Sequence, residues 1–134
     1  MKILIVGGTG TIGKKVSGHF SKNHEVIIAA RTSGDVALDM GDSESIKSMF
    51  EKVGKVDAVV CTAGEAKWAE FASMTEADFY IGLKSKLMGQ VNLVRIGKEY
   101  LNPGGSFTLS TGILADHPVA LTTSAAMVNG GIHS

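Results

Sequence analysis

The feature that most constrains this chain is a glycine-rich segment directly after a continuously apolar run. Ile3–Val6 is apolar and mostly β-branched, which is typical of a strand buried on both faces of a sheet. Glycines follow at positions 7, 8, 10 and 13. Ile12, Val16 and Phe20 then recur every four residues, which predicts a helix that buries these side chains. This order of strand, glycine turn and helix is typical of a turn that binds a dinucleotide pyrophosphate.

The chemistry of such a turn explains why it needs glycine. The backbone must adopt positive φ, and its amides must approach the pyrophosphate closely. The helix that follows offers unpaired N–H groups and about half a positive charge to the phosphates. Threonine hydroxyls in the turn can add hydrogen-bond donors for the phosphates. The alternative interpretation of this segment is a plain strand-to-helix connection. We therefore predict cofactor contacts by Gly7, Gly8, Thr9, Gly10, Thr11, Ile12 and Gly13.

The second expected strand covers residues 26–30, and an arginine follows it directly. In dinucleotide-binding sheets the end of this strand meets the adenosine ribose. An acidic residue there suits the 2′-hydroxyl of NAD, and an arginine suits the 2′-phosphate of NADP. Arg31, with Thr32 beside it, therefore favours NADP(H). Asp35 lies slightly farther along and keeps NAD open, and a solvated arginine without a ligand is the other alternative.

Strand-like and helix-like segments alternate along the whole chain. This alternation predicts an α/β fold with a Rossmann-like, doubly wound parallel sheet in three αβα layers, as one domain over residues 1–134. A helix capped by Asp42 or Ser43 is expected to bury Ile46, Met49, Phe50 and Val53. The expected strands are 3–6, 26–30, 36–38, 56–62 and 106–111.

A long helix is expected over residues 75–101. Thr75 to Asp78 has the pattern of a capping box, and Asn102–Gly105 is a stop signal. The segment is apolar on more than one face, so the helix is either deeply buried or in contact with another subunit. We therefore expect a homo-oligomer formed through this helix.

Composition narrows the class of protein. The chain is 44% hydrophobic and 19% charged, with 13 basic and 13 acidic residues and no net charge, which disfavours nucleic acid as a partner. Apolar runs reach only about six residues, whereas a membrane span needs about 20. The single Cys61 indicates a reducing cytoplasm. We expect no signal peptide before the first strand and, from the spacing of histidines and cysteine, no metal site.

These motifs together resemble those of the short-chain dehydrogenase/reductase family, in particular its small, atypical bacterial members. The resemblance implies that Asp39 and Met40 contact adenine and that Ala63 and Gly64 border the cofactor ribose. It also implies an oxidoreductase that passes a hydride between NADP(H) and a small carbonyl or alcohol, and a dimer packed through the long helix. The matching segments are Gly7–Gly13, Arg31, Leu38–Met40 and Thr62–Gly64.

The resemblance breaks down at the active site. Ser110 and Thr111 stand where the family has the serine that binds the substrate carbonyl, and Lys86 stands where it has a water-holding asparagine. A lysine there could bind phosphate or, if desolvated, act as an acid. Ala125 and Asn129 occupy the positions of the catalytic tyrosine and lysine. Alanine has no transferable proton, and general acid–base catalysis typically supplies 10²–10⁴-fold.

The chain is also shorter than the family pattern, since the last strands of the usual sheet are missing. We expect either a shortened form or an assembly that covers the open sheet edge. The leading hypothesis is an NADP(H)-dependent oxidoreductase whose substrate is unknown. The alternatives are a non-catalytic NADP(H)-binding sensor or pseudoenzyme, and a fragment that binds nothing tightly.

Overall fold

The computed structural model describes residues 1–134, and its centre is a sheet of five parallel strands. The strands lie in the order β3-β2-β1-β4-β5. The chain therefore builds outward from β1 in one direction and then crosses back to the other side of β1. The strands are β1 (Lys2–Val6), β2 (Glu25–Ala30), β3 (Val36–Ala37), β4 (Val56–Cys61) and β5 (Leu101–Thr108).

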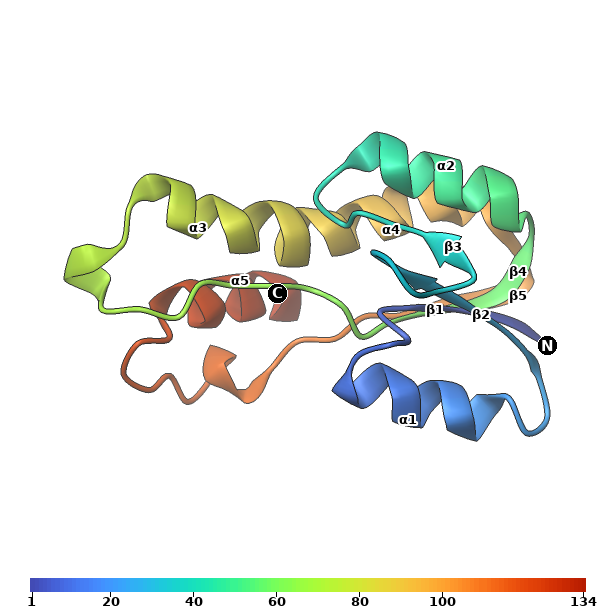
Figure 1. The fold of residues 1–134 in the computed structure, drawn as a ribbon, viewed down its shortest axis with the longest axis horizontal. Coiled ribbons are helices and arrows are strands. Elements are labelled where there is room, and N and C mark those ends of the chain that lie inside the picture. The colour runs from blue at the N-terminus through green and yellow to red at the C-terminus, as the bar shows by residue number, and fades with distance from the viewer.

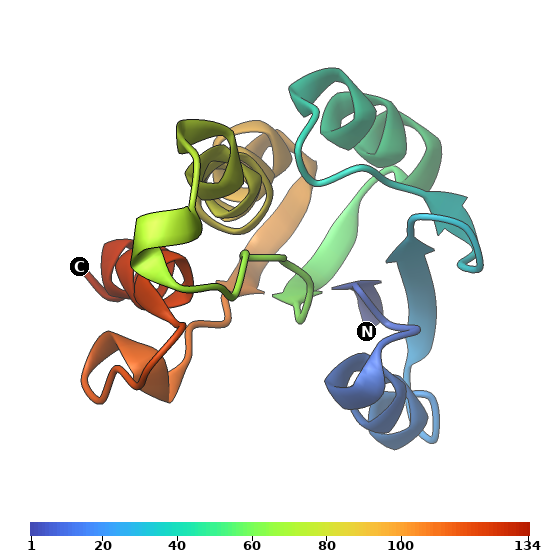
Figure 2. The same cartoon turned by 60° about the vertical axis from the view of Figure 1, so that its left-hand side comes forward.

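Helices cover both faces of this sheet. α1 lies on one face, and α2 and α4 lie on the opposite face (Figures 1 and 2). α5 packs against α3 and the π-helical segment η2. These layers confirm the predicted Rossmann-like α/β fold. The helices are α1 (Thr11–Phe20), α2 (Ser43–Val53), α3 (Glu76–Gly82), η2 (Leu83–Met88), α4 (Gly89–Gly97) and α5 (Thr123–His133), with 3₁₀ turns at Phe71–Ser73, Lys98–Tyr100 and Ile113–Ala115.

The main core lies between the sheet and the α2–α4 layer. α2 begins after Asp42, whose side chain accepts a hydrogen bond from the Glu44 N–H at 2.9 Å. Leu93 of α4 is fully buried in the same cluster. The predicted core face of α2 is confirmed, because Ile46, Met49, Phe50 and Val53 are all buried.

The buried face predicted for α1 is wrong. Ile12 is 66% exposed, and Val16 and Phe20 are only half-buried. The buried residues of α1 are instead Gly13 and Ser17. Small residues let this helix lie very close to the sheet, and that proximity pushes the larger apolar side chains to the edges of the contact.

A nearly continuous helical rod runs from Glu76 to Tyr100. Thr75 and Asp78 form the predicted capping box, and the hydrogen bonds from Thr75 hold the pKa of Asp78 below its ordinary value. The rod differs from the prediction in containing a π-helical segment and in ending before Leu101, which starts β5. None of the helices combines the length and the apolar character that crossing a membrane requires.

The strand bounds also need correction. β5 spans Leu101–Thr108 rather than 106–111, and it includes Asn102–Gly105, the predicted stop signal that follows the helical rod. Proline is tolerated there because β5 is an edge strand. The pairing of β5 with β4 also shifts register between Val56 and Ala58. Ser110 and Thr111 therefore lie beyond the strand. β3 ends at Ala37, so Leu38 is outside it.

Asp57 ties three strands together at the amino end of the sheet. Its carboxylate accepts hydrogen bonds from the Asn102 side chain at 2.8 Å and from the Lys2 N–H at 2.6 Å. These two donors, Asn102 first, hold the pKa of Asp57 below its ordinary value of 3.8.

This lowered pKa gives an expected pH dependence. The carboxylate stabilises the fold above the unfolded-state pKa, and that contribution disappears as pH falls through the lower folded-state pKa. We expect Asp57→Asn to flatten the acid limb of the free energy of unfolding below about pH 4. Urea unfolding between pH 2 and 7 measures this, with the exposed Glu51→Gln as control. Identical acid limbs for Asp57→Asn and wild type would contradict it.

Candidate nucleotide-binding site

The turn between β1 and α1 adopts a conformation that only glycine accommodates. Gly7 has φ of +82°, and a Cβ at this position would lie 2.8 Å from the Cβ of Ala63. Its N–H donates to the carbonyl of Ala29 at 2.8 Å, and the Gly10 N–H donates to the Gly7 carbonyl at 3.0 Å. The turn is thus hydrogen-bonded to β2 and packs against Ala63, just after β4.

The start of α1 is pressed against this turn. A Cβ on Gly13 would lie only 2.0 Å from the Gly7 carbonyl oxygen, and one on Gly8 would lie 2.8 Å from Ile28. The N-cap residue is Gly10, so no side chain bonds the first N–H groups of the helix. These N–H groups have no partner within the helix and form a ready anion site.

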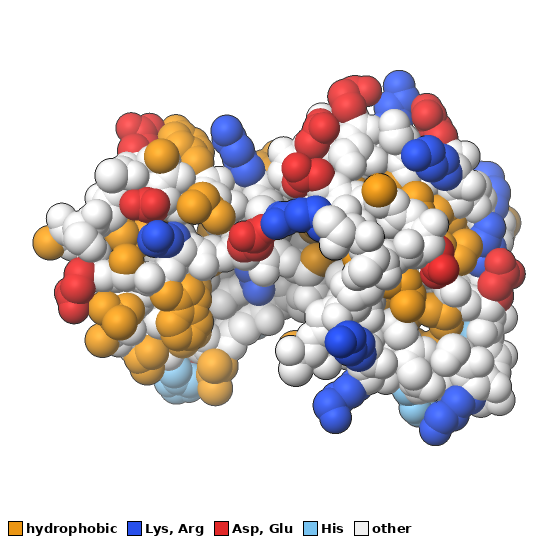
Figure 3. All heavy atoms as spheres, in the orientation of Figure 1, with side chains coloured by type: hydrophobic (Ala, Val, Ile, Leu, Met, Phe, Trp, Pro, Cys, Tyr) orange, Lys and Arg blue, Asp and Glu red, His pale blue; other side chains and the backbone are white.

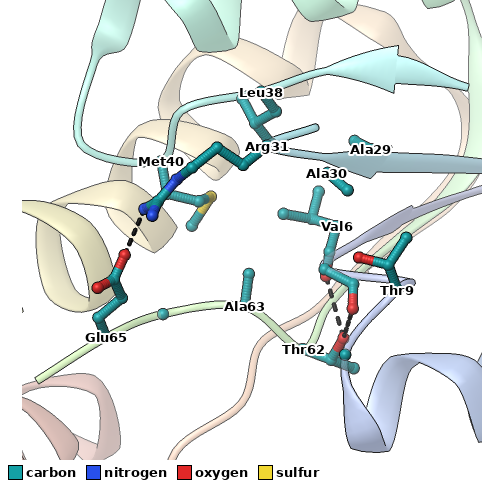
Figure 4. Close-up of a pocket in the computed structure, with 13 residues that line it drawn as sticks. Val6, Thr9, Ala29, Ala30, Arg31, Leu38, Met40, Thr62, Ala63 and Glu65 are labelled. Atoms are coloured by element: carbon teal, nitrogen blue, oxygen red, sulfur yellow. Dashed lines mark hydrogen bonds and ion pairs between the residues drawn. The ribbon is translucent and has the colours of Figure 1, made fainter. Parts of the chain in front are cut away.

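A pocket of about 410 Å³ opens beside the turn, at the carboxyl ends of the strands (Figure 4). The strand order reverses at β1, and ligands of doubly wound sheets bind at such a point. The Thr62 hydroxyl donates to the Val6 and Gly7 carbonyls at 3.1 and 3.2 Å and so joins β4 to the turn. The lining residues are Val6, Gly7, Thr9, Gly10, Ala29, Ala30, Arg31, Leu38, Met40, Thr62, Ala63, Gly64 and Glu65.

An ion pair lies at the rim of this pocket. The guanidinium of Arg31, after β2, contacts the carboxylate of Glu65, in the loop after β4 (Figure 4). The hydrogen bond and charge of Glu65 raise the pKa of Arg31 further above its ordinary value. Sequence reasoning did not identify Glu65. The only sequence signal that Glu65 belongs to the site is its position directly after Ala63 and Gly64.

The π-helical segment η2 supports the loop that carries Glu65. Gly64 has φ of +139°, and a Cβ there would lie 2.8 Å from the Lys86 Cγ. The Glu65 N–H donates to the Ser85 hydroxyl at 3.3 Å. π-helical turns occur frequently at functional sites. Behind this loop, burial raises the pKa of Cys61 to about 11, so its thiol stays protonated at neutral pH.

The pocket brings together about half of the predicted cofactor residues. Thr11, Ile12 and Thr32 are exposed and do not line it. Asp39 does not line it either, and its carboxylate accepts a hydrogen bond from the Gly41 N–H at 2.8 Å. Gly8 and Gly13 act through packing, as described above. The predicted residues that line the pocket are Gly7, Thr9, Gly10, Arg31, Met40, Ala63 and Gly64.

Comparison with known proteins agrees with this geometry. The model of the NAD dependent epimerase/dehydratase family matches residues 3–116. The solved structure of the protein lin1944 from Listeria innocua is 46% identical over 98% of this chain and 66% of its own, with a TM-score of 0.96. Two structures of a small-chain dehydrogenase, the second in complex with NADPH, are each 30% identical over 98% of this chain, with TM-scores of 0.90. The chain belongs to the short-chain dehydrogenase/reductase family.

This family member spans only part of its solved relatives. It covers 66% of the lin1944 chain, and 70% and 60% of the two small-chain dehydrogenase chains. No curated protein matches it significantly.

The residues expected to be catalytic lie outside the rim of the pocket. Gln90 holds the Ser110 backbone, accepting from its N–H at 2.9 Å and donating to its carbonyl at 2.8 Å. The Thr111 hydroxyl donates to the Asn129 carbonyl at 2.8 Å. Lys86 is half-buried and makes no hydrogen bond to Ser110 or Thr111.

The two residues expected at the family's catalytic positions both lie on α5. Ala125 and Asn129 are 5% and 4% exposed, and they are four residues apart on one face of the helix. Neither can exchange a proton at neutral pH. No three His, Cys, Asp or Glu side chains are grouped as metal ligands.

The glycine contacts of α1 generate a matched pair of substitutions. Gly13→Ala forces backbone displacement at the turn, and we expect the free energy of unfolding to fall by about 2 kcal/mol or more, as in overpacked cores. Gly18, in the same helix, has nothing within 4 Å of an added Cβ. Gly18→Ala should therefore raise stability by up to about 1 kcal/mol through helix propensity. Urea unfolding measures both, and equal effects would refute the packing argument.

Proposed function

We propose that this chain binds NADP(H) and acts as an oxidoreductase on a small carbonyl or alcohol. The observation that carries the proposal is a glycine turn beside a strand-end pocket whose rim bears Arg31. Positive φ at Gly7, and the absence of room for side chains at Gly7 and Gly13, are what a pyrophosphate cradle requires. The NADPH complex of the 30% identical small-chain dehydrogenase supports the same ligand.

Each part of the dinucleotide has a matching group in this chain. The backbone N–H groups at the start of α1 would hold the pyrophosphate. The buried side chains of Val6, Leu38 and Met40 give the pocket an apolar wall suited to adenine. Arg31 would bind the 2′-phosphate of NADP, because its guanidinium forms paired hydrogen bonds with phosphate oxygens. Without this phosphate, NAD(H) would bind more weakly.

The proposed chemistry uses few protein groups. When bound, NADP(H) supplies or accepts the hydride. The Ser110 hydroxyl makes no hydrogen bond within the chain, whereas the Thr111 hydroxyl is committed to Asn129. Ser110 is therefore the better of the two candidates to polarise a substrate carbonyl. Lys86 or water would supply the proton.

A specific observation favours a second candidate, a non-catalytic NADP(H)-binding sensor. Ala125 and Asn129 leave α5 without an acid or a base at the family's catalytic positions. Such a protein would bind the cofactor through the same pocket and act through a partner.

Assembly and location are further proposals. Ile81, Met88 and Val91 are 40–46% exposed on the helical rod, and we infer that they pack in a homo-oligomer. Apolar side chains also gather over the end of the molecule formed by α3 and α5 (Figure 3). A cytoplasmic location rests on the single cysteine.

Calorimetric titration with NADPH and NADH tests cofactor binding. Hydrogen bonds to charged groups contribute about 1.5–3 kcal/mol, and 1.4 kcal/mol corresponds to about tenfold in affinity. We expect Arg31→Ala to weaken NADPH binding about tenfold or more and to leave NADH nearly unchanged. The matched control is Arg95→Ala, because Arg95 is the chain's other arginine and is exposed on α4. Equal affinity of the wild type for both dinucleotides would contradict the assigned role of Arg31.

Single-turnover oxidation of NADPH with a panel of small aldehydes and ketones separates the two candidate functions. An enzyme should oxidise NADPH faster than buffer does, and Ser110→Ala or Lys86→Ala should slow this step. Ser106→Ala, on the exposed edge strand, should leave it unchanged. Binding of NADPH without any oxidation would favour the sensor instead.

A further inference from the structure

We propose that Glu65 is a specificity-determining residue that lowers the preference of the pocket for 2′-phosphorylated dinucleotides by competing for Arg31. The inference rests on the proposed binding of NADP(H) and concerns the same pocket. In this view Arg31 and Glu65 together, and not Arg31 alone, set the ratio of NADPH to NADH affinity.

The first observation is the position of the ion pair. Arg31 follows β2 and Glu65 follows β4, so the pair connects two sides of the pocket at its rim (Figure 4). Both residues line the same cavity. An Nη2–H of Arg31 donates a hydrogen bond to the Glu65 carboxylate. This N–H is therefore not free to bind a phosphate.

The second observation is that the backbone of Glu65 is held in place. Its N–H donates to the hydroxyl of Ser85, which is only 9% exposed and belongs to η2. Gly64 packs so tightly on Lys86 that a Cβ would lie 2.8 Å from the Lys86 Cγ. The loop therefore presents the Glu65 side chain from a fixed point opposite Arg31.

These contacts have unequal consequences for the two dinucleotides. A 2′-phosphate must displace the Glu65 carboxylate from Arg31 before it can bind the guanidinium fully, and this displacement reduces its affinity. A ligand with a free 2′-hydroxyl does not need the guanidinium, so its affinity does not depend on this displacement. Arg31 and Glu65 are 66% and 52% exposed, and exposed pairs contribute at most about 1 kcal/mol, so the competition is modest. Removal of the charge should therefore tighten NADPH binding by about three- to fivefold.

The decisive variant is Glu65→Gln, which keeps the size of the side chain and removes its charge. NADPH and NADH affinities are measured by calorimetry for the wild type, E65Q and the control E99Q. E99Q removes one negative charge from an exposed residue at the far end of the helical rod. We expect E65Q to tighten NADPH binding about three- to fivefold while NADH changes less than about twofold. E99Q should change neither.

A double-mutant cycle tests whether Glu65 acts through Arg31. In the Arg31→Ala background, Glu65→Gln should improve NADPH binding by less than about twofold, because the group for which Glu65 competes is absent. The fragments 2′,5′-ADP and 5′-AMP should reproduce the contrast, since only the former carries the 2′-phosphate.

The outcomes separate this inference from the proposed function. An unchanged NADPH to NADH ratio in E65Q, or weaker NADH binding that shows Glu65 to be a ribose ligand, overturns the inference alone. A full E65Q effect in the Arg31→Ala background also overturns it. If neither wild type nor E65Q binds either dinucleotide, the proposed function fails and this inference fails with it.

Discussion

The site depends on a close approach between two backbones, at the end of β1 and the start of α1. A Cβ on Gly13 would sit 2.0 Å from the Gly7 carbonyl oxygen, and no side chain fits in that distance. The contact brings the unpaired N–H groups of α1 to the carboxyl end of the central strand. It also explains why the helix buries Gly13 and Ser17 while Ile12 stays exposed. This contact therefore determines where the pocket lies and makes it suited to a negatively charged ligand.

The remainder of the site is assembled from strand ends that are distant in sequence. Arg31 and Glu65 are 34 residues apart, yet parallel β2 and β4 flank β1 and bring their following residues to one edge. The helical rod contributes from the outside, because Ser85 holds the Glu65 backbone. A substitution in the π-helical segment would therefore alter the rim of the pocket by displacing the loop that carries Glu65. The shared parallel direction of the strands makes this possible, since it gathers their carboxyl ends on one side.

The sequence predicted the parts of this structure that depend on local patterns. The apolar strands along the chain, the glycine turn, the core face of α2 and the capping box at Thr75 all have short-range signals. Two errors had a physical cause. Periodicity counts apolar residues, so it placed Ile12 in the core, although glycine made the close contact there. Asn102–Gly105 has the composition of a turn, but an edge strand tolerates proline. The ion pair of Arg31 with Glu65 had no local signal, because it depends on which strands become neighbours.

The packing of α5 also limits which side chains fit at positions 125 and 129. Ala125 is 5% exposed, so a tyrosine at this position would need space that the packed helix does not provide. Gly112 lies so near Asn129 that a Cβ would be 2.9 Å from its Nδ2, so the longer side chain of a lysine would also be crowded. The side-chain oxygens of Ser124 and Asn129 are buried without hydrogen-bond partners, which are costly groups to leave unpaired. At positions 125 and 129 α5 thus carries no acid, and we expect any proton transfer at the proposed site to use groups on η2, after β5 or in solvent.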